Sequence, residues 1–349
     1  MPALRYVDDS LPGITRKRRG RYWQYFDSDG HRITDRDEID RLNAIGMPPA
    51  YERCWFCPIA NGHIQAIGYD ARGRRQYRYH PDFRAQQEVL KYERLADFGR
   101  ALPKLRKQVE EDIQGKPTSC EAVIAAVVRL IDATQMRIGN ESYAKENKSF
   151  GATTLRNRHA KVGRGALKIS YAGKHGVKRT VTVTDRNLAR IARRTQDLPG
   201  QNLFEFCDEE GCVRPVTSSD VNDYIRDAMG DEFTAKDFRT WGATLAAFQR
   251  LARTTLPYRA GRDGTQGPPS ERALAGLENA VVREVAHALG NTPAICRKSY
   301  IDPCVFAGWR DGTLQRAAAA GGANGARGER QWEEAALRYL RRAHRAKRG

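Results

Sequence analysis

One tyrosine in this sequence stands where a nucleophile would be expected. The segment LGNTPAICRKSYIDP, residues 289–303, has a glycine suited to ending one helix and a Thr-Pro pair suited to starting the next. This pattern predicts Asn291 in the corner and Tyr300 about two turns along the new helix, which Asp302-Pro303 would end. A phenol held near a turn amide in a basic chain suggests attack on a phosphodiester. The alternative is that the ring only fills space on a helix face.

The charge of the chain points to an anionic partner. Among 349 residues, 60 are Lys or Arg and 42 are Asp or Glu, which gives a net charge of +18. This bias favours a polyanion, most often nucleic acid, and a basic protein without such a partner is the plainer alternative. The apolar runs are far shorter than the roughly 20 residues that span a bilayer, and the N-terminus lacks the apolar stretch of a signal peptide. We therefore expect a cytoplasmic, nucleoid-associated protein with no membrane partner.

The cysteines and the usual cofactor motifs favour neither a metal nor a nucleotide. Seven scattered cysteines suit reduced thiols in a cytoplasm. Cys54 and Cys57 have a zinc-compatible spacing, which Cys207 with Cys212, or His63, would have to complete. The different gap of the second pair, and the aromatic residues within the first, argue against a zinc site. Walker A, HExxH and dinucleotide-binding patterns do not occur in the sequence. We expect no cofactor and no metal.

The first 81 residues predict a small β-rich domain. Short alternating runs surround an Asp-Gly turn within YWQYFDSDGHRI, read as a hairpin, and a second turn at residues 70–73. The strand after the second turn interleaves basic, amide and aromatic side chains, namely Arg74, Arg75, Gln76, Tyr77 and Tyr79. Arginines reach phosphates, glutamine reads base edges and tyrosines pack on sugars or bases, so these residues are candidates for DNA binding. The alternative is a solvated amphipathic strand.

A helical period begins at Pro81, which is the predicted domain boundary. A second helix follows from about residue 120, and Arg137 continues its apolar stripe just before a Gly-Asn pair that would stop the helix. Arg137 is then either a favourable charge at a helix C-terminus, with its stem packed, or an anion clamp. A later helix at 236–253 has an apolar face, and Arg239 is predicted to lie beside that face rather than on it.

Residues 152–184 alternate with a period of two and predict a small antiparallel sheet. Its hairpin tip is AGKHG, so Lys174 lies on a glycine-flanked loop, where a lysine is usually only a solvated charge. The Gly/Pro-rich stretch 257–272 predicts a loop, and residues 320–328 predict a flexible linker. The basic helix after the linker is expected to be an addition to the core and a further phosphate contact.

Four motifs in this order resemble the catalytic domain of type IB DNA topoisomerases of the compact poxvirus and bacterial kind. They are QMRIGNESYA at 135–144, the AGKHG hairpin, KDFRTWGAT at 236–244 and LGNTPAICRKSY at 289–300. The segment HIQAIGYDARGRRQYRY is similar to the DNA-contacting segment of that family. The resemblance runs from near residue 20 to near residue 305 and leaves out the C-terminal tail.

The resemblance implies a role for each residue of the site. Tyr300 would attack a DNA phosphodiester and form a 3'-phosphotyrosyl linkage, and Arg137 and Arg239 would hold the non-bridging oxygens. Lys174 would be the general acid for the leaving 5'-oxygen. Asn291 stands where many relatives carry a histidine that donates to a non-bridging oxygen. An amide supplies the same donor but does not gain a proton, which puts any role of a charged imidazole in doubt.

The resemblance also implies the organisation of the chain. We expect an α+β fold: a β-rich DNA-clamping domain at 1–81, a larger and mainly helical catalytic domain with a small antiparallel sheet at 82–319, and a linker with a basic helix at 320–349. Tyr143 would be a further DNA contact. The implied activity is relaxation of positive and negative supercoils in double-stranded DNA by a monomer. It would need neither ATP nor an obligatory metal, because one phosphodiester is exchanged for another of similar energy.

Two other functions remain open at this stage. A tyrosine recombinase shares the Arg, Lys, Arg, His and Tyr chemistry, but it is expected to carry a helical DNA-binding domain first and to act as a multimer. The strand-rich first 80 residues argue against it. A non-catalytic basic DNA-binding protein would use Tyr300 and the arginines only for backbone contacts, and would form no covalent adduct with DNA.

Overall fold

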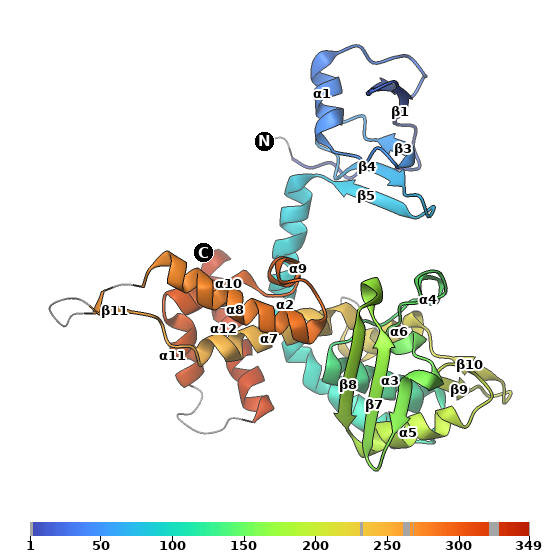
Figure 1. Cartoon of the computed structure of the whole chain (residues 1–349), viewed down its shortest axis with the longest axis vertical. Coiled ribbons are helices and arrows are strands. Elements are labelled where there is room, and N and C mark those ends of the chain that lie inside the picture. The colour runs from blue at the N-terminus through green and yellow to red at the C-terminus, as the bar shows by residue number, and fades with distance from the viewer. Residues whose placement is uncertain (1–2, 231–232, 261–265, 268, 321–327, 349) are drawn as a thin grey trace. The chain divides into compact units, whose positions relative to one another are not determined.

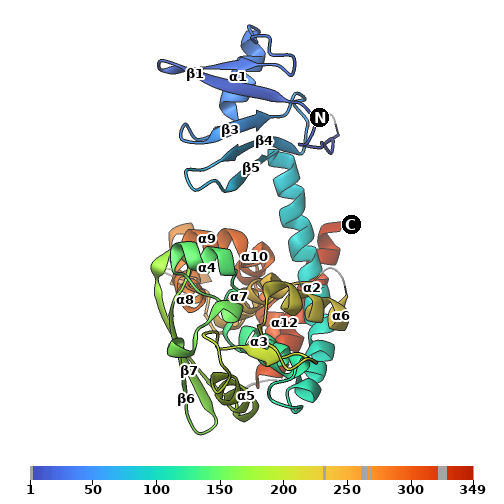
Figure 2. The same ribbon diagram turned by 90° about the vertical axis from the view of Figure 1, so that its right-hand side faces the viewer.

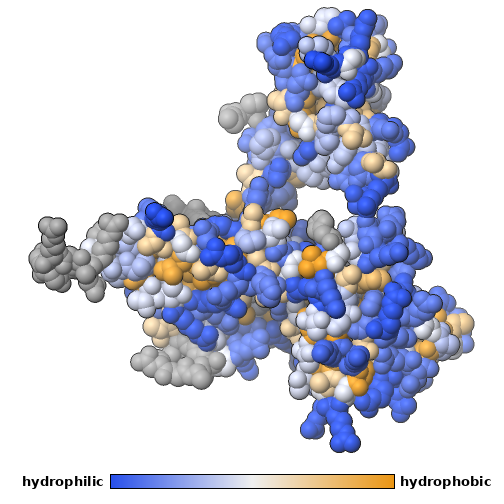
Figure 3. All heavy atoms as spheres, viewed as in Figure 1, coloured by the Kyte–Doolittle hydropathy of each residue, from blue (hydrophilic) through white to orange (hydrophobic). Residues whose placement is uncertain are grey.

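The structure of the protein is a computed structural model, shown in Figure 1. It describes residues 3–230, 233–260, 266–267, 269–320 and 328–348. The chain divides into two compact units, residues 1–92 and 93–349. Across the described ranges, no helix has both the length and the apolar composition that crossing a membrane requires. Hydrophilic side chains cover most of the visible face of each unit (Figure 3), in keeping with the 29% of residues that are charged.

The first unit is built on an antiparallel sheet in the order β2-β1-β3-β4-β5. The strands are β1 (Ile14–Arg19), β2 (Tyr22–Phe26), β3 (Glu52–Phe56), β4 (Ile64–Tyr69) and β5 (Arg75–Tyr79). Side chains that alternate along the strands bury Ile14, Tyr25 and Phe56 in one cluster with Leu42 of α1 (Arg36–Ala44). The predicted β-rich start of the chain is confirmed.

The two turns predicted in this unit have different outcomes. The turn at 70–73 joins β4 to β5 as predicted, with Gly73 at a φ of 71° and its N–H donating to the Asp70 carbonyl at 2.8 Å. The Asp-Gly turn also forms, but the strand after it supplies a single bridge, Phe26 to Arg32. The chain then enters α1, which the alternating pattern did not predict. The predicted hairpin is therefore present only as this short antiparallel pair, and the full-length partner of β2 is the preceding strand β1.

A long helix, α2 (Pro81–Asp112), begins at the predicted residue and carries the division between the two units. Proline is suited to this first position because it lacks an N–H that a first turn would leave unpaired. Gly99 allows α2 to approach α7 closely, since a Cβ there would lie 2.4 Å from the Trp241 ring. Phe98 on the same helix is buried beside Phe238, with ring centroids 5.1 Å apart.

The second unit is mainly helical (Figures 1 and 2). Its further helices are α3 (Cys120–Thr134), α4 (Glu141–Asn147), α5 (Arg186–Gln196), α6 (Ser218–Met229), α7 (Ala235–Ala252), α8 (Glu271–Leu289), α9 (Pro293–Ser299), α10 (Pro303–Arg310), α11 (Thr313–Ala319) and α12 (Glu329–Arg348). α7 lies at the centre, in contact with α3, α8, α10, α11 and α12. Its buried residues recur at helical spacing, which explains why the segment folds as one long helix.

A three-stranded antiparallel sheet lies against α5 in this unit. Its strands are β6 (Ala160–Val162), β7 (Ala166–Ala172) and β8 (Lys178–Thr184). Two separate two-stranded sheets are formed by β9 (Glu205–Cys207) with β10 (Val213–Pro215) and by β11 (Arg259–Ala260) with β12 (Gln266–Gly267). The sheet was predicted to start at 152, and that start is wrong. Residues 152–159 form two short 3-10 turns because the N–H groups of Ala152 and Thr153 donate to the carbonyls of Arg137 and Ile138.

The C-terminal helix departs from its prediction. α12 forms as a basic helix, but it is part of the core: Trp332, Tyr339 and Leu340 are buried, and Trp332 packs on Phe248 of α7. Its apolar stripe is hidden in the sequence by the surrounding arginines. The predicted linker at 320–328 falls mostly outside the described residues, and a smaller part of the predicted loop at 257–272 also does. The predicted α+β class is confirmed.

Candidate active site

Tyr300 lies in the corner between α9 and α10. α9 begins after Thr292, whose Oγ1 accepts from the Ile295 N–H at 3.3 Å, and it ends at Ser299. Tyr300 is therefore the C-cap, at φ −131° and ψ −25°, and its N–H donates to the Cys296 carbonyl at 3.0 Å. The prediction that Asp302-Pro303 ends this helix is wrong, because Asp302 is instead the N-cap of α10.

Asn291 lies in the tight corner before α9, as predicted. Gly290 ends α8 in the left-handed region at a φ of 64°, and the Asn291 N–H donates to the Ala286 carbonyl at 2.9 Å. The side-chain oxygen of Asn291 accepts from Arg137 Nη2 at 2.5 Å. Its Nδ2 is buried and has no hydrogen-bond partner among the described residues, so the amide keeps a donor available at the site.

Arg137 comes from a segment without regular secondary structure after α3, and the prediction that it continues the helical stripe is wrong. α3 stops at Thr134 because Gln135 adopts the left-handed conformation, with φ 48°, and its N–H donates to the Ile131 carbonyl at 2.8 Å. The chain then runs without regular secondary structure to α4, and the Arg137 side chain reaches Asn291 rather than the end of α3.

Arg239, which was predicted beside the apolar face of α7, is buried, with only 3% of its surface exposed. Backbone carbonyls replace water around the guanidinium: one nitrogen donates to the Gln135 carbonyl, and Nη2 donates to the Leu289 carbonyl at 3.1 Å. The Cζ atom lies 5.0 Å from the centroid of the Tyr300 ring. Burial, and then the charge of Arg137, lower the pKa of Arg239.

The charges around Tyr300 favour its phenolate. Burial by itself raises the pKa of a phenol, but Arg239 first, then Arg137 and Lys236, act in the opposite direction. The net result is a pKa for Tyr300 below its ordinary value of 10.0. Lys236 was not singled out from the sequence. It precedes Arg239 by three residues on α7, so helical spacing would have placed both cations on one side of that helix.

Lys174 lies at the tip of the β7–β8 hairpin, in the turn Lys174–Gly176, and is exposed. The tip is closed by the Gly173 N–H donating to the Val177 carbonyl at 2.8 Å. Figures 1 and 2 show this tip, α4 and α9 at the same end of the helical unit, away from α5. The hairpin therefore carries Lys174 from the sheet toward the corner that holds Tyr300.

One pocket of about 370 Å³ collects the predicted residues of this unit, except Asn291. It is lined by Arg137, Ile138, Gly139, Asn140, Tyr143, Ser149, Phe150, Lys174, Ala235, Lys236, Arg239 and Tyr300. Tyr143 projects into it from the first turn of α4, whose N-cap Asn140 accepts from the Tyr143 N–H at 3.0 Å. Four of the lining residues are basic and, within the described part of the chain, none is acidic. Such a site suits an anion whose charge is spread over several oxygens.

Two supporting residues were also missed. Arg179 of β8 donates through Nη1 to the His287 carbonyl at 3.0 Å, which ties the hairpin that carries Lys174 to the last turn of α8. Thr244 of α7 donates to the Tyr300 carbonyl at 3.1 Å. Neither is signalled by sequence pattern, because each acts through backbone groups that only the fold brings near.

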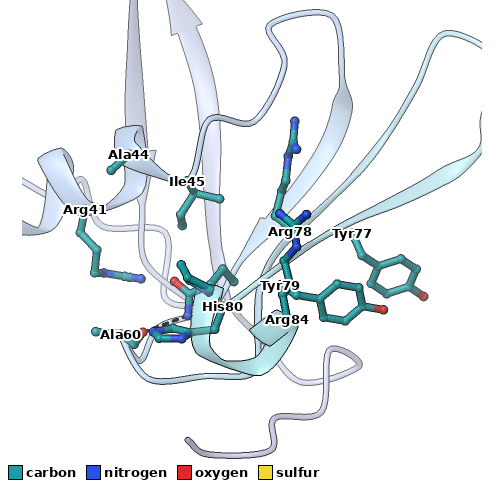
Figure 4. A pocket seen from close by; sticks show the side chains of 11 residues that line it. Arg41, Ala44, Ile45, Ala60, Tyr77, Arg78, Tyr79, His80 and Arg84 are labelled. Carbon is teal, nitrogen blue, oxygen red and sulfur yellow. Dashed lines mark hydrogen bonds between the residues drawn. The ribbon is translucent and has the colours of Figure 1, made fainter. Parts of the chain in front are cut away.

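The predicted DNA-binding residues of the first unit lie on β5, an edge strand, except Arg74, which directly precedes it. Tyr77 and Tyr79 project on one side with parallel rings, their centroids 5.8 Å apart, and are 39% and 40% exposed (Figure 4). Arg74 is paired with Asp70 at 2.8 Å and Arg75 with Asp9, while Gln76 donates to Asp70 at 3.2 Å. The two tyrosines and the two arginines are exposed to a similar extent, but the arginines are already held in ion pairs.

A cavity of about 640 Å³ beside β5 adds further basic side chains to the same surface. Arg78, His80 and Arg84 line it together with the two tyrosines (Figure 4). The cysteines of this unit do not contribute: Cys54 and Cys57 are buried, which raises the pKa of both thiols.

Two families match the chain. The family described as eukaryotic DNA topoisomerase I, catalytic core, matches residues 80–304, and the family described as bacterial DNA topoisomerase IB, N-terminal domain, matches residues 22–70. The DNA topoisomerase 1B of Acanthamoeba polyphaga mimivirus is 32% identical over 295 residues, which are 83% of this chain and 85% of that protein. The DNA topoisomerase 1B of vaccinia virus strain Copenhagen is 22% identical over 72% of this chain and 73% of that protein.

A solved structure of the XerH site-specific recombinase, bound to a palindromic difH substrate, aligns with a TM-score of 0.37 and 16% identity over 63% of this chain. This chain spans about half of that recombinase, 51% of its length. The resemblance drawn from the four sequence motifs is confirmed by the family matches. The chain belongs to the type IB DNA topoisomerases, which are isomerases.

Proposed function

We propose that this chain relaxes supercoiled duplex DNA by cutting one strand through Tyr300, letting the duplex rotate and then resealing it. The observation that carries the proposal is the surroundings of the Tyr300 phenol, which lines one pocket with Arg137, Lys174, Lys236 and Arg239. It is half-buried, yet Arg239, Arg137 and Lys236 outweigh burial and keep its pKa below the ordinary value. A phenol with an ordinary pKa is a poor nucleophile at neutral pH, so this environment favours attack.

Arg137 and Arg239 are the proposed clamp for the scissile phosphate. Negative charge grows on the non-bridging oxygens as Tyr300 attacks, and planar guanidinium groups bind such oxygens with two parallel donors. Both arginines keep their charge throughout the reaction, so the clamp does not depend on a proton. The Asn291 Nδ2 is a further donor for one of these oxygens, since it has no partner among the described residues.

Lys174 is the proposed general acid. When Tyr300 forms its bond to phosphorus, the bond to the 5'-oxygen breaks, and that oxygen must take up a proton to leave as a hydroxyl. An ammonium on an exposed hairpin tip can supply it once DNA lies against the tip. The product is a 3'-phosphotyrosyl strand and a free 5'-hydroxyl, and the same groups in reverse reseal the strand.

This scheme stores the energy of the broken bond in the new phosphodiester. No ATP is then needed, and the charge that a metal would neutralise is met by the cations of the site. Torsional strain in the DNA supplies the direction of change. We further propose that the β5 tyrosines and Tyr143 contact the same double-stranded DNA. The protein would act as a monomer, because one chain supplies the whole set of residues. It would act in the cytoplasm, on the nucleoid.

The deciding experiment is relaxation of negatively and positively supercoiled plasmids in EDTA, without ATP, by the wild type and by Tyr300→Phe. We expect the wild type to relax both and the variant neither, while the variant still binds DNA. Denaturation with detergent during the reaction should leave a covalent protein–DNA adduct with the wild type alone. A wild type that binds DNA but leaves both plasmids supercoiled and forms no adduct would make a non-catalytic DNA-binding protein the better description.

A further inference from the structure

The backbone that carries Tyr300 is fixed by one buried threonine. Thr244 of α7 is fully buried, and its hydroxyl donates to the Tyr300 carbonyl at 3.1 Å. The same oxygen accepts from the N–H of Asp302, also at 3.1 Å. The position of Tyr300 is therefore coupled to that of Asp302, two residues further on.

Asp302 is in turn held by the C-terminal helix. Its side chain is 1% exposed, and one carboxylate oxygen caps α10 by accepting from the Cys304 N–H at 2.9 Å. The other oxygen lies 2.7 Å from Nε2 of His344, a residue of α12 whose side chain is 12% exposed. His344 is thus the hydrogen-bond partner of the Asp302 oxygen that does not cap α10.

The same three side chains, Asp302, Cys304 and His344, form a group whose potential metal-ligand atoms lie within 4.8 Å of one another. A zinc ion with bonds of 2.0 to 2.2 Å would hold its nitrogen and oxygen ligands about 3.3 Å apart in a tetrahedron. The oxygen and nitrogen of Asp302 and His344 are 2.7 Å apart, which is the separation of a hydrogen bond. The contact between Asp302 and His344 is therefore a hydrogen bond, with a proton between the two atoms.

α12 is a firm support for this contact. The Tyr339 hydroxyl donates to the Cys304 carbonyl at 2.6 Å, which adds a second link from α12 to the start of α10. Nearer its N-terminus, Glu333 pairs with Arg106 of α2 at 2.7 Å. Because α12 is tied at several points along its length, the His344 ring is anchored rather than carried by a loose tail.

We propose that His344 is a positioning residue for the nucleophile, acting on Tyr300 through Asp302 and Thr244. Without His344, a buried carboxylate oxygen would lose its donor, and Asp302 would turn to find another. The α10 cap and the Tyr300 peptide would move with it. Attack on phosphorus is sensitive to displacements of about 1 Å. The inference rests on the proposed role of Tyr300 as nucleophile, and it gives the C-terminal helix a part in catalysis without contact with DNA.

The test compares His344→Leu, which removes the donor, with His344→Gln, whose amide restores an N–H at similar reach. The matched control is Arg345→Ala, at the exposed neighbouring position of α12. All are made in the full-length chain. Adduct formation is followed at saturating protein on a short duplex, so that the rate reports the chemical step, and DNA affinity is measured separately. We expect adduct formation by His344→Leu to be slowed roughly tenfold or more, with unchanged affinity, and wild-type behaviour from His344→Gln and the control.

Wild-type adduct formation by His344→Leu, or equal slowing by His344→Leu and His344→Gln, would overturn the inference. If His344→Leu does not fold, His344→Asn takes its place, because its amide stops short of Asp302, and the same outcomes decide. A wild type that forms no adduct at all would defeat the proposed function and this inference with it. If the wild type forms the adduct and His344→Leu forms it equally fast, only the inference about His344 is defeated.

Discussion

The guanidinium of Arg137 donates to the side-chain oxygen of Asn291 across 2.5 Å. The amide thus orients one arm of the proposed phosphate clamp through its oxygen, while its nitrogen is left as a donor. A neutral histidine at this corner would offer one donor and one acceptor as well, but it would also take up a proton near pH 6.5. Asparagine keeps the donor and acceptor fixed at every pH at which the protein is folded.

This relationship predicts the effect of substitutions at Asn291. Asn291→Ala removes one donor to the transition state, and we expect adduct formation to fall roughly 10²-fold. Asn291→Asp keeps the acceptor for Arg137 but puts a negative charge beside the phosphate and the phenolate, so we expect a larger fall and weaker DNA binding. Asn291→His is the control, expected to stay within about tenfold of the wild type because it retains a donor. Equal activity of the Ala and Asp variants would contradict this account.

Arg239 should set the pH profile of cleavage. Burial raises the pKa of Tyr300 and Arg239 is the strongest of the groups that lower it, so removing the guanidinium should raise that pKa. The sign follows because a positive neighbour stabilises the phenolate and not the neutral phenol. Single-turnover cleavage by Arg239→Ala should be slower at pH 7 and should level off at a higher pH than the wild type. In Arg239→Lys, which keeps a positive charge, the pH at which cleavage levels off should rise by a smaller amount. An unchanged profile in Arg239→Ala would show that Arg239 does not tune the nucleophile.

The role of Lys174 is separable from that of the clamp by changing the leaving group. A DNA strand with sulfur in place of the bridging 5'-oxygen releases a thiolate, which needs little protonation because thiols are far more acidic than alcohols. We expect Lys174→Ala to be slowed by at least ~10²-fold on ordinary DNA and to recover most of that loss on the sulfur substrate. Arg137→Ala, the control, should be slow on both. A Lys174→Ala defect of equal size on both substrates would assign the lysine to DNA binding or charge stabilisation instead.

The residues of the site show what sequence reasoning reached and where it stopped. Asn291 could be placed in its corner because glycine in the left-handed region is a local property of the chain. Lys174 could be placed on a hairpin tip for the same reason. Arg137 was assigned to a helix that ends three residues earlier, because the left-handed Gln135 is not a residue type that signals a helix end. Arg239 was placed beside the apolar face, but its burial could not be predicted, because it depends on backbone carbonyls from two distant segments.

The fold shows the same division. Period-two alternation predicted β4, β5, β7 and β8, but it also suggested strand at 152–159, where backbone bonds to Arg137 and Ile138 impose 3-10 turns. The buried stripe of α12 was masked by its arginines, so the tail was taken as an addition to the core. Local signals thus predicted most elements, and the errors arose where distant backbone groups or a mixed helix face decide the outcome.

The corner that holds Tyr300 is also predicted to depend on one buried carboxylate. Glu278 of α8 is 1% exposed and pairs with Arg297 of α9 and Arg310 of α10, which are 39% and 34% exposed. Glu278→Gln leaves Arg297 without this counter-charge and leaves Arg310 with only the exposed Glu271, although water reaches both arginines. We therefore expect a loss of about 2 kcal/mol, below the usual cost of stranding a fully buried charge, and a fall in Tm of roughly 4–8 °C.

The matched control for Glu278 is Glu271→Gln. Glu271 pairs with the same Arg310 but is 82% exposed. Exposed ion pairs contribute little to the stability of folded proteins. We expect no measurable change in Tm for this variant by calorimetry. Equal losses from the two variants would show that burial of Glu278 does not decide the strength of this network.

The edge strand β5 gives a last prediction, on DNA affinity. Tyr77 and Tyr79 are stacked and partly exposed, whereas Arg74 is already held by Asp70. We expect Tyr77→Ala to weaken duplex binding about tenfold, or ~1.4 kcal/mol. Arg74→Ala should leave the salt dependence of binding unchanged, because a lysine or arginine lowers that slope by about one only when it neutralises a phosphate.

The control is Tyr22→Ala, which removes a 78% exposed tyrosine from β2, the other edge strand of the same sheet. It should bind duplex DNA as the wild type does. Titrations of all three variants at several salt concentrations would separate the aromatic contacts from the ionic ones. If Arg74→Ala lowers the slope by about one while Tyr77→Ala binds normally, then Arg74 must leave Asp70 for a phosphate when DNA arrives. The arginine, and not the tyrosine pair, would then be the DNA contact of this strand.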